Sequence, residues 1–158
     1  MKIIFLLLFT LVSLPAHATR PDIDTVSILG LAPGLDGKLV AAHISSKLDT
    51  MLWNDDAGVG IVKFAGNYFG NKGEFRIAYD KGLVSQVSFV VPTHDEVETK
   101  KIYDQLSQDI SGGFGPPDIE TTNAVHEMRW EGMKQSISVK AEDGTKYVTI
   151  ALSKFGTQ

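Results

Sequence analysis

The chain has 158 residues, with 15 lysine and arginine side chains against 19 aspartate and glutamate side chains and a formal net charge of −4. Nucleic acid is an improbable partner, because binding to phosphates requires a basic patch and none is visible. The chain also lacks cysteine. This absence excludes disulfide bonds, a cysteine nucleophile and the acylated residue that would tether an exported protein to a membrane.

Residues 1–18 have the composition of a secretory signal. A positive residue, an apolar run and an A-x-A cleavage site follow one another at Lys2, residues 3–14 and Ala16-His17-Ala18. A membrane anchor is the alternative, but the run is shorter than the ~20 residues that span a bilayer and Pro15 interrupts it. We therefore expect cleavage after Ala18 and a periplasmic or secreted location without membrane insertion. After cleavage, residues 19–158 are expected to form a single compact domain. Its net charge is −5, because Lys2 is removed with the signal.

The first part of the mature chain is expected to form an extended segment and then a helix. Residues 19–28 read as extended, and Gly30, Pro33 and Gly34 interrupt the backbone after them. Residues 38–52 then carry apolar side chains at helical spacing, and Asp36 is a plausible N-cap. This pattern predicts an amphipathic helix over 38–52. The polar stretch 53–58 is expected to be a loop.

Residues 59–91 alternate as β-strands do. We predict strands near 59–69, 74–79 and 83–91, the last two forming a hairpin with one apolar face. Asp80-Lys81-Gly82 between them predicts a three-residue loop with a bulge. Residues 66–73 leave two possibilities: either Tyr68 and Phe69 extend the strand to a tight turn at 70–73, or the whole stretch is a loop. We favour the strand.

A second helix is predicted over 94–111. Thr93 and Glu96 form the T-x-x-E capping box, and Val97 can pack against Pro92 as a hydrophobic staple. Gly112-Gly113 is expected to end the helix. Alternating residues then predict three further strands near 123–130, 134–141 and 146–153.

The two halves of the mature chain therefore share one layout. We predict an α+β fold of two tandem helix-plus-three-strand units, about 19–91 and 92–158, with the helices packed on one face of an antiparallel sheet or sheets. Aligning Gly82 with Gly144 puts the apolar residues after the two turns out of step by one position. Because such a shift moves side chains to the opposite face, at least one hairpin must carry a bulge or differ in loop length.

This layout, with L-G-L-x-P-G at 29–34 and F-G-P-P at 114–117, resembles the tandem repeat of the β-lactamase-inhibitor-protein-like fold. The small outer-membrane assembly lipoprotein of the SmpA/OmlA group looks similar to a single such unit. The resemblance implies a non-catalytic exported protein that binds another protein. This chain departs from both groups, because those inhibitors carry disulfides and those lipoproteins carry an acylated cysteine.

No contiguous enzyme motif is present: the sequence has no G-x-S-x-G, no H-E-x-x-H and no phosphate-binding glycine loop. The three histidines of the mature chain have no i, i+4 pair, so we expect no metal site. His94, beside Asp95 and Glu96, could hold a cation, although acidic residues are expected in the first turn of any helix. We predict no catalytic residue and no cofactor.

Four aromatic residues in breaker-rich segments are the candidate binding anchors: Trp53, Tyr68, Phe69 and Phe114. The alternative is that these rings fold back onto the ends of the sheet. The leading hypothesis is a soluble exported protein-binding module, such as an inhibitor or immunity-type protein acting on a periplasmic or secreted enzyme. One alternative is a small-ligand carrier whose pocket, between helix and sheet, is faced by His43 or Trp130. The other is an enzyme with a non-contiguous site.

Overall fold

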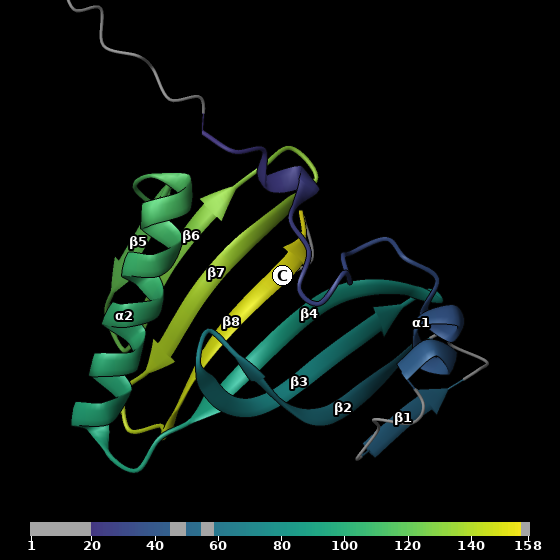
Figure 1. Ribbon diagram of the computed structural model, residues 1–158, viewed down its shortest axis with the longest axis horizontal. Coiled ribbons are helices and arrows are strands. Elements are labelled where there is room, and N and C mark those ends of the chain that lie inside the picture. The colour runs from purple at the N-terminus through teal and green to yellow at the C-terminus, as the bar shows by residue number, and fades with distance from the viewer. Residues whose placement is uncertain (1–19, 45–49, 55–58, 156–158) are drawn as a thin grey trace, which may run out of the picture.

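A computed structural model describes residues 20–44, 50–54 and 59–155, whose strands form one antiparallel sheet (Figure 1). The strand order is β1-β2-β3-β4-β8-β7-β6-β5, so two four-stranded meanders join where β4 pairs with β8. The elements in chain order are the 3₁₀ helix η1 (Ile23–Thr25), α1 (Gly37–Ile44), β1 (Thr50–Asn54), β2 (Val59–Tyr68), β3 (Asn71–Asp80), β4 (Leu83–Pro92), α2 (Glu96–Phe114), β5 (Ile119–Thr122), β6 (Val125–Glu131), β7 (Gln135–Glu142) and β8 (Tyr147–Lys154).

The predicted fold class is therefore wrong. The described chain is a predominantly β structure around a single eight-stranded sheet, not two helix-plus-three-strand units. Residues 50–52, expected in the first helix, belong to β1, because a short apolar run fits a strand as well as a helix. The strand β5 was not expected, since Ile119 is its only apolar residue. Of the predicted loop 53–58, residues 55–58 lie outside the described residues.

The β3–β4 hairpin contains the bulge that the sequence required, at an unexpected place. Asp80 pairs with Leu83, so Lys81 and Gly82, both at positive φ, form a two-residue loop and not the predicted three-residue one. The register shifts between Ala78, opposite Gln86, and Tyr79, opposite Val84. This leaves Ser85 as the extra residue. The bulge therefore brings Val84, and not Leu83, to the buried face.

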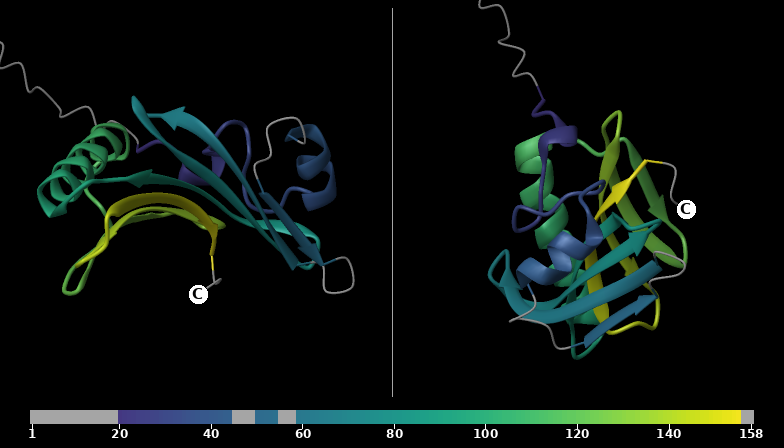
Figure 2. Two further views of the ribbon diagram at one scale, coloured as in Figure 1. Left: turned by 90° about the horizontal axis from the view of Figure 1, so that it is seen from below. Right: turned by 90° about the vertical axis from the view of Figure 1, so that its right-hand side faces the viewer.

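The β2–β3 turn confirms the strand interpretation of Tyr68. Tyr68 ends β2 and pairs with Asn71, so the turn consists of Phe69 and Gly70, both at positive φ. The turn therefore comes before the predicted 70–73. Figure 2 shows this hairpin rising above the sheet on the side that carries the helices. There the Tyr68 ring packs edge-on against Phe75 and Phe89.

The helix α2 begins and ends later than predicted. Asp95 is the N-cap, accepting from the Glu98 amide at 2.8 Å, while the Glu98 carboxylate accepts from the His94 amide at 2.6 Å. The expected staple is absent, because Val97 is 80% exposed. Gly115 ends the helix, with φ 78° and its N–H bonded to the Ser111 carbonyl. Gly112-Gly113 stays helical.

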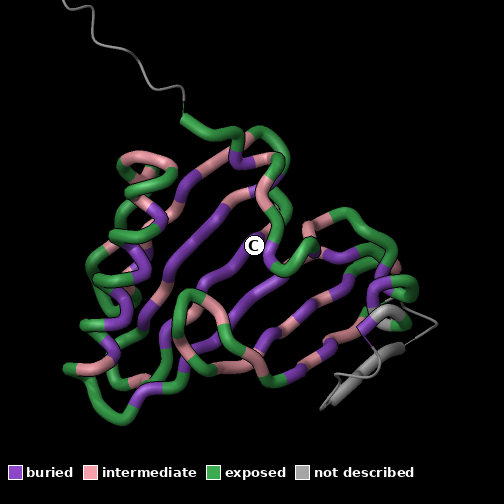
Figure 3. The backbone as a smooth tube through the Cα atoms, in the orientation of Figure 1, coloured by how far each residue is buried: buried purple, intermediate pink, exposed green. Residues whose placement is uncertain are grey.

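Alternation divides the sheet into two faces of different character. One face packs under α2, α1, η1 and the β2–β3 hairpin, and its core follows the central strands (Figures 1 and 3). No described element lies across the other face, which we call the open face (Figure 2). The core includes Phe75, Ile77, Val87, Phe89, Trp130, Val139, Val148, Ile150 and Leu152. Trp130, fully buried, donates from Nε1 to the Gly115 carbonyl at 2.9 Å, which ties β6 to the end of α2.

The N-terminal segment is clamped to the β6–β7 turn by one carboxylate. Asp24 accepts three backbone N–H bonds, from Met133, Lys134 and Gln135, at 3.0, 2.8 and 3.1 Å. The Gln135 side chain donates back to the carbonyls of Ile23 and Val26. A Cβ at Gly132 would overlap the Asp24 carboxylate, so a larger residue there would push the carboxylate off its three N–H donors. The predicted extended entry segment thus contains η1.

Asp24 makes stability depend on pH. The backbone N–H donors, that of Lys134 foremost, hold the pKa of Asp24 below its ordinary value of 3.8. A lowered pKa stabilises the folded state above the unfolded pKa, and this contribution disappears as pH falls through the folded value. We expect Asp24→Asn to lower the midpoint of urea unfolding at pH 7 and to change it much less near pH 2. A constant difference across this range would contradict the clamp.

Candidate functional site

Two hollows lie on opposite faces of the sheet. The open-face groove, of about 620 Å³, is lined by Gln86, Glu127, Arg129, Glu131, Ser136, Ser138, Lys140, Ser153, Lys154 and Phe155. The helix-side cavity, of about 550 Å³, lies between α2 and the β7–β8 turn. Of the core residues, Tyr103 and Ala141 line the helix-side cavity, and none lines the open-face groove.

The register builds the open face in rows that cross the sheet. One row runs through Lys63, Arg76, Ser88, Ala151, Ser138 and Arg129. Its three central members are small and buried. Because four strand spacings separate β3 from β6, the two arginines stand about 19 Å apart. The open face is therefore a floor of small side chains between two charged rims.

Each rim is a cluster of one lysine, one glutamate and one arginine. On β6 and β7, Glu127 accepts from Arg129 Nε at 2.9 Å and lies 3.3 Å from Lys140 Nζ. On β2 and β3, Glu74 accepts from Arg76 Nε, and Lys63 lies 4.0 Å away. The glutamate and arginine of each rim come from the same short pattern, E-x-R, at 74–76 and 127–129. We call these clusters the β6 rim and the β3 rim.

The two rims differ in burial. The Glu127 side chain is 11% exposed and that of Arg129 21%, whereas Glu74 and Arg76 are 38% and 41% exposed. Glu131 extends the β6 rim at 3.9 Å from Arg129. Pairing holds these long side chains in fixed positions. Charges this far out of water gain little net stability from pairing, so the β6 rim is not explained by stability alone.

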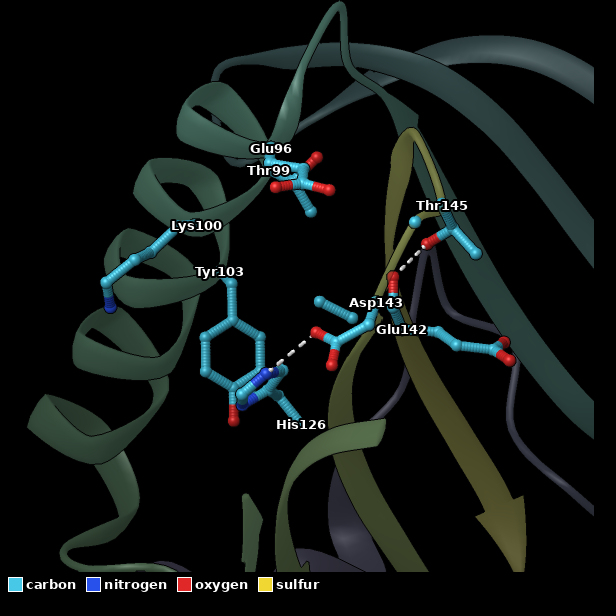
Figure 4. A pocket seen from close by; sticks show the side chains of 10 residues that line it. Glu96, Thr99, Lys100, Tyr103, His126, Glu142, Asp143 and Thr145 are labelled. Carbon is cyan, nitrogen blue, oxygen red and sulfur yellow. Dashed lines mark hydrogen bonds and ion pairs between the residues drawn. The ribbon is translucent and has the colours of Figure 1, made fainter. Parts of the chain in front are cut away.

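The helix-side cavity has an aromatic wall. Tyr103 of α2 and His126 of β6 meet edge to face, with ring centroids 6.2 Å apart (Figure 4). His126 Nε2 lies 3.2 Å from Asp143 Oδ1 in the β7–β8 turn. Burial foremost, together with the nearby carboxylates of Glu120, Asp104 and Glu127, raises the pKa of Tyr103 to about 12. The phenol is therefore neutral at physiological pH.

The aromatic candidates occupy different places. Tyr68 and Phe114 are partly buried against the core, one at the β2–β3 turn and the other at the end of α2. Phe69 is 42% exposed and meets Tyr68 edge-on. Trp53 lies in β1 opposite Gly60, and its side chain is outside the described residues. Tyr68 and Phe114 thus follow the alternative expectation of rings folded onto the sheet.

Of the two ligand-pocket candidates, Trp130 is the one whose side chain the structure describes. Trp130 is fully buried and lines neither hollow. His43 falls in α1, and its side chain is outside the described residues. His94 bonds Glu98 through Nδ1 at 2.7 Å, which places it in the cap of α2. Among the described residues, no group of three histidine or carboxylate side chains could hold a metal ion.

Sequence reasoning missed the residues that line the hollows. The signal for the open face was present, because Glu127, Arg129 and Glu131 alternate with His126, Met128 and Trp130. The apolar residues of each alternation predict the strands, and the polar residues between them form the open face. The helix-side cavity had no comparable signal, since it joins α2 to a turn about 40 residues away.

No protein-family model, no curated protein and no solved structure matches this chain. The resemblance to the β-lactamase-inhibitor-protein-like fold therefore stays a prediction. Among the described residues, no helix has the length and apolar character needed to cross a bilayer.

The matched glutamates allow a direct comparison of the rims. We expect Glu127→Gln to lower the free energy of unfolding by about 1–3 kcal/mol, because it leaves Arg129 and Lys140 without their shared carboxylate in a mostly buried place. Glu74→Gln, at the more exposed rim, should cost less than about 1 kcal/mol. Urea unfolding of both variants at pH 7 measures the difference. Equal effects would show that burial does not distinguish the rims.

Proposed function

We propose that the chain is an exported protein-binding module that uses its open face to hold an acidic segment of a partner protein. The observation that carries the proposal is the floor of small side chains between the two Lys-Glu-Arg rims. The two rims, Glu131 included, contribute four cations and three glutamates, although the whole chain has a net charge of −4. This excess of positive charge is complementary to carboxylates on a partner.

The dimensions of the floor suit a protein element better than a small molecule. A helix with its side chains is about 10–12 Å across, and the rims stand about 19 Å apart. The small residues Ser88, Ser138 and Ala151 are only 4%, 5% and 3% exposed, so a partner on this face would contact mainly the longer side chains beside them. Figure 2 shows β8 bowed so that this face is hollowed along the strand. A partner on this face would thus contact the β3 rim on one side and the β6 rim on the other.

Fixed arginine side chains favour binding. Arginine is enriched at interface hot spots, and ordering a side chain before binding lowers the entropy that binding costs. Arg76 and Arg129 are each held by a glutamate on their own strand. Among the groups with shifted pKa values, only Tyr103 lines either hollow, so the described residues do not bring shifted acids and bases together as an active site does. An inhibitor or immunity-type protein acting on an exported enzyme fits these features.

Capture from a periplasmic or secreted extract of the source organism tests the proposal. The bait is the exported chain, and its mass should be that of residues 19–158. We expect Arg76→Gln/Arg129→Gln to weaken binding of the captured protein at least tenfold, since arginine contacts at hot spots are worth about 2 kcal/mol or more. Titration calorimetry with the purified partner measures the change.

Two control variants test whether the loss of affinity is specific to the open face. Asp80→Asn/Asp109→Asn changes two charges outside both hollows and should leave the affinity unchanged. Phe69→Ala tests the exposed aromatic on the opposite side of the sheet. A partner whose affinity falls with Phe69→Ala but not with the arginine variant would overturn the open-face assignment. A chain that keeps residues 1–18 and stays in the cytoplasm would contradict the exported part of the proposal.

A further inference from the structure

The open face carries an exposed aromatic ring at each end of β8. Tyr147, the first residue of the strand, is 41% exposed, and Phe155, which follows its last residue, is 53% exposed. Val148, Ile150 and Leu152 point into the core, so Tyr147 has the parity of the open face. Phe155 lines the open-face groove. Both rings therefore belong to the face that the proposed function uses.

The side chains between the two rings are smaller. On the open face of β8 they are Thr149, Ala151 and Ser153, and none of the three is exposed. Figure 2 shows the strand bowed so that this face is concave, which brings the two ends of β8 closer to a partner than its middle. Eight residue steps separate the rings, so their backbones stand at most about 26 Å apart. A partner segment that lies along β8 thus meets a ring at each end.

Backbone hydrogen bonds hold both ends of β8 in place. The Thr93 amide donates to the carbonyl of Lys146, the residue before Tyr147, at 2.8 Å. The Phe155 amide donates to the Lys134 carbonyl in the β6–β7 turn, also at 2.8 Å. An aromatic side chain has only two torsions to order, so a ring on a fixed backbone loses little entropy when it is covered. Such rings are effective binding anchors.

The groove beside the middle of β8 has more positive than negative side chains. It is lined by three cations and two glutamates: Arg129, Lys140, Lys154, Glu127 and Glu131. The surface along β8 therefore reads aromatic, net positive, aromatic. A complementary partner segment is apolar at its two ends and acidic between them.

We propose that the partner segment on the open face lies along β8, with acidic residues between two apolar side chains that contact Tyr147 and Phe155. The inference rests on the proposed open-face function, and it adds the chemistry of the segment and its direction. The two rings are specificity-determining residues in this account, because cations alone would accept any acidic segment.

A titration of residues 19–158, followed by amide nuclear magnetic resonance spectra, tests the inference with a defined probe. The blocked peptide WSESESESW carries two tryptophans at the spacing of the rings, with glutamates between them. We expect saturable shifts at Tyr147, Arg129 and Phe155. The peptide SESWEWSES, of the same composition, and WSKSKSKSW, with lysines for glutamates, should each bind at least about fivefold more weakly. No saturation with the first peptide, or equal binding of either of the others, would overturn the proposal.

Single variants assign the contacts to the rings. Tyr147→Ala and Phe155→Ala should each weaken binding of the first peptide about fivefold, and Tyr147→Phe should recover most of what Tyr147→Ala loses. Phe69→Ala removes a ring of similar exposure, 42%, from the opposite side of the sheet and should leave the affinity unchanged. Urea unfolding of each variant checks that it is folded. Loss of affinity in only one ring variant would contradict placement along β8.

The captured partner distinguishes failure of this inference from failure of the proposed function. Weaker binding by Arg76→Gln/Arg129→Gln, but by neither ring variant, would leave the open-face function standing and overturn the placement along β8. Unchanged binding by all of these variants would overturn both. Sedimentation of the chain alone tests a second copy as the occupant. A dimer that dissociates in Tyr147→Ala/Phe155→Ala would assign the rings to self-association and overturn the inference.

Discussion

The pairing of β4 with β8 is the interaction on which the rest of the structure depends. Seven register pairs, from Gln86 opposite Ser153 to Pro92 opposite Tyr147, join the two meanders into one sheet. On the covered side the seam brings Phe89 against Ile150 in the core. On the open side it places Ser88 beside Ala151 as the middle of the floor. Without this seam there would be two small sheets, each with a bare apolar edge, and neither rim would face the other.

Alternate residues of each strand point to opposite faces of the sheet, and the two faces differ in character. Residues at one parity build a dry core under α2 and the β2–β3 hairpin, and residues at the other parity carry paired charges. The bulge at Ser85 is needed for this division, because Val84 would otherwise point to the open face and Leu83 to the core. A single extra residue thus keeps the β3 rim in register with the floor.

Local patterns in the sequence were enough to predict six of the strands, the hairpins that join them and the need for a bulge. They could not predict the seam, the clamp of Asp24 on the β6–β7 turn or the bond from Trp130 to Gly115, because these contacts join residues that no local pattern relates. The helix over 38–52 was extended too far for a related reason. The short apolar run Met51-Leu52-Trp53 fits a helix or a strand, and pairing of β1 with β2 decides between them. In the candidate site, too, the local pattern was visible in the sequence and the contact between distant residues was not. The E-x-R pattern at 127–129 was visible, but its relation to 74–76 needed the order of the strands.

Hydrogen exchange under native conditions tests the single-sheet account most directly. If the seam makes one cooperative unit, the amides of residues 87–91 and 148–152 that bond across it should exchange only through global unfolding, with the same free energy as the interior amides of β3 and β7. Exchange of the seam at a clearly lower free energy, with the two meanders still protected, would show that the halves are separate units and would contradict the account.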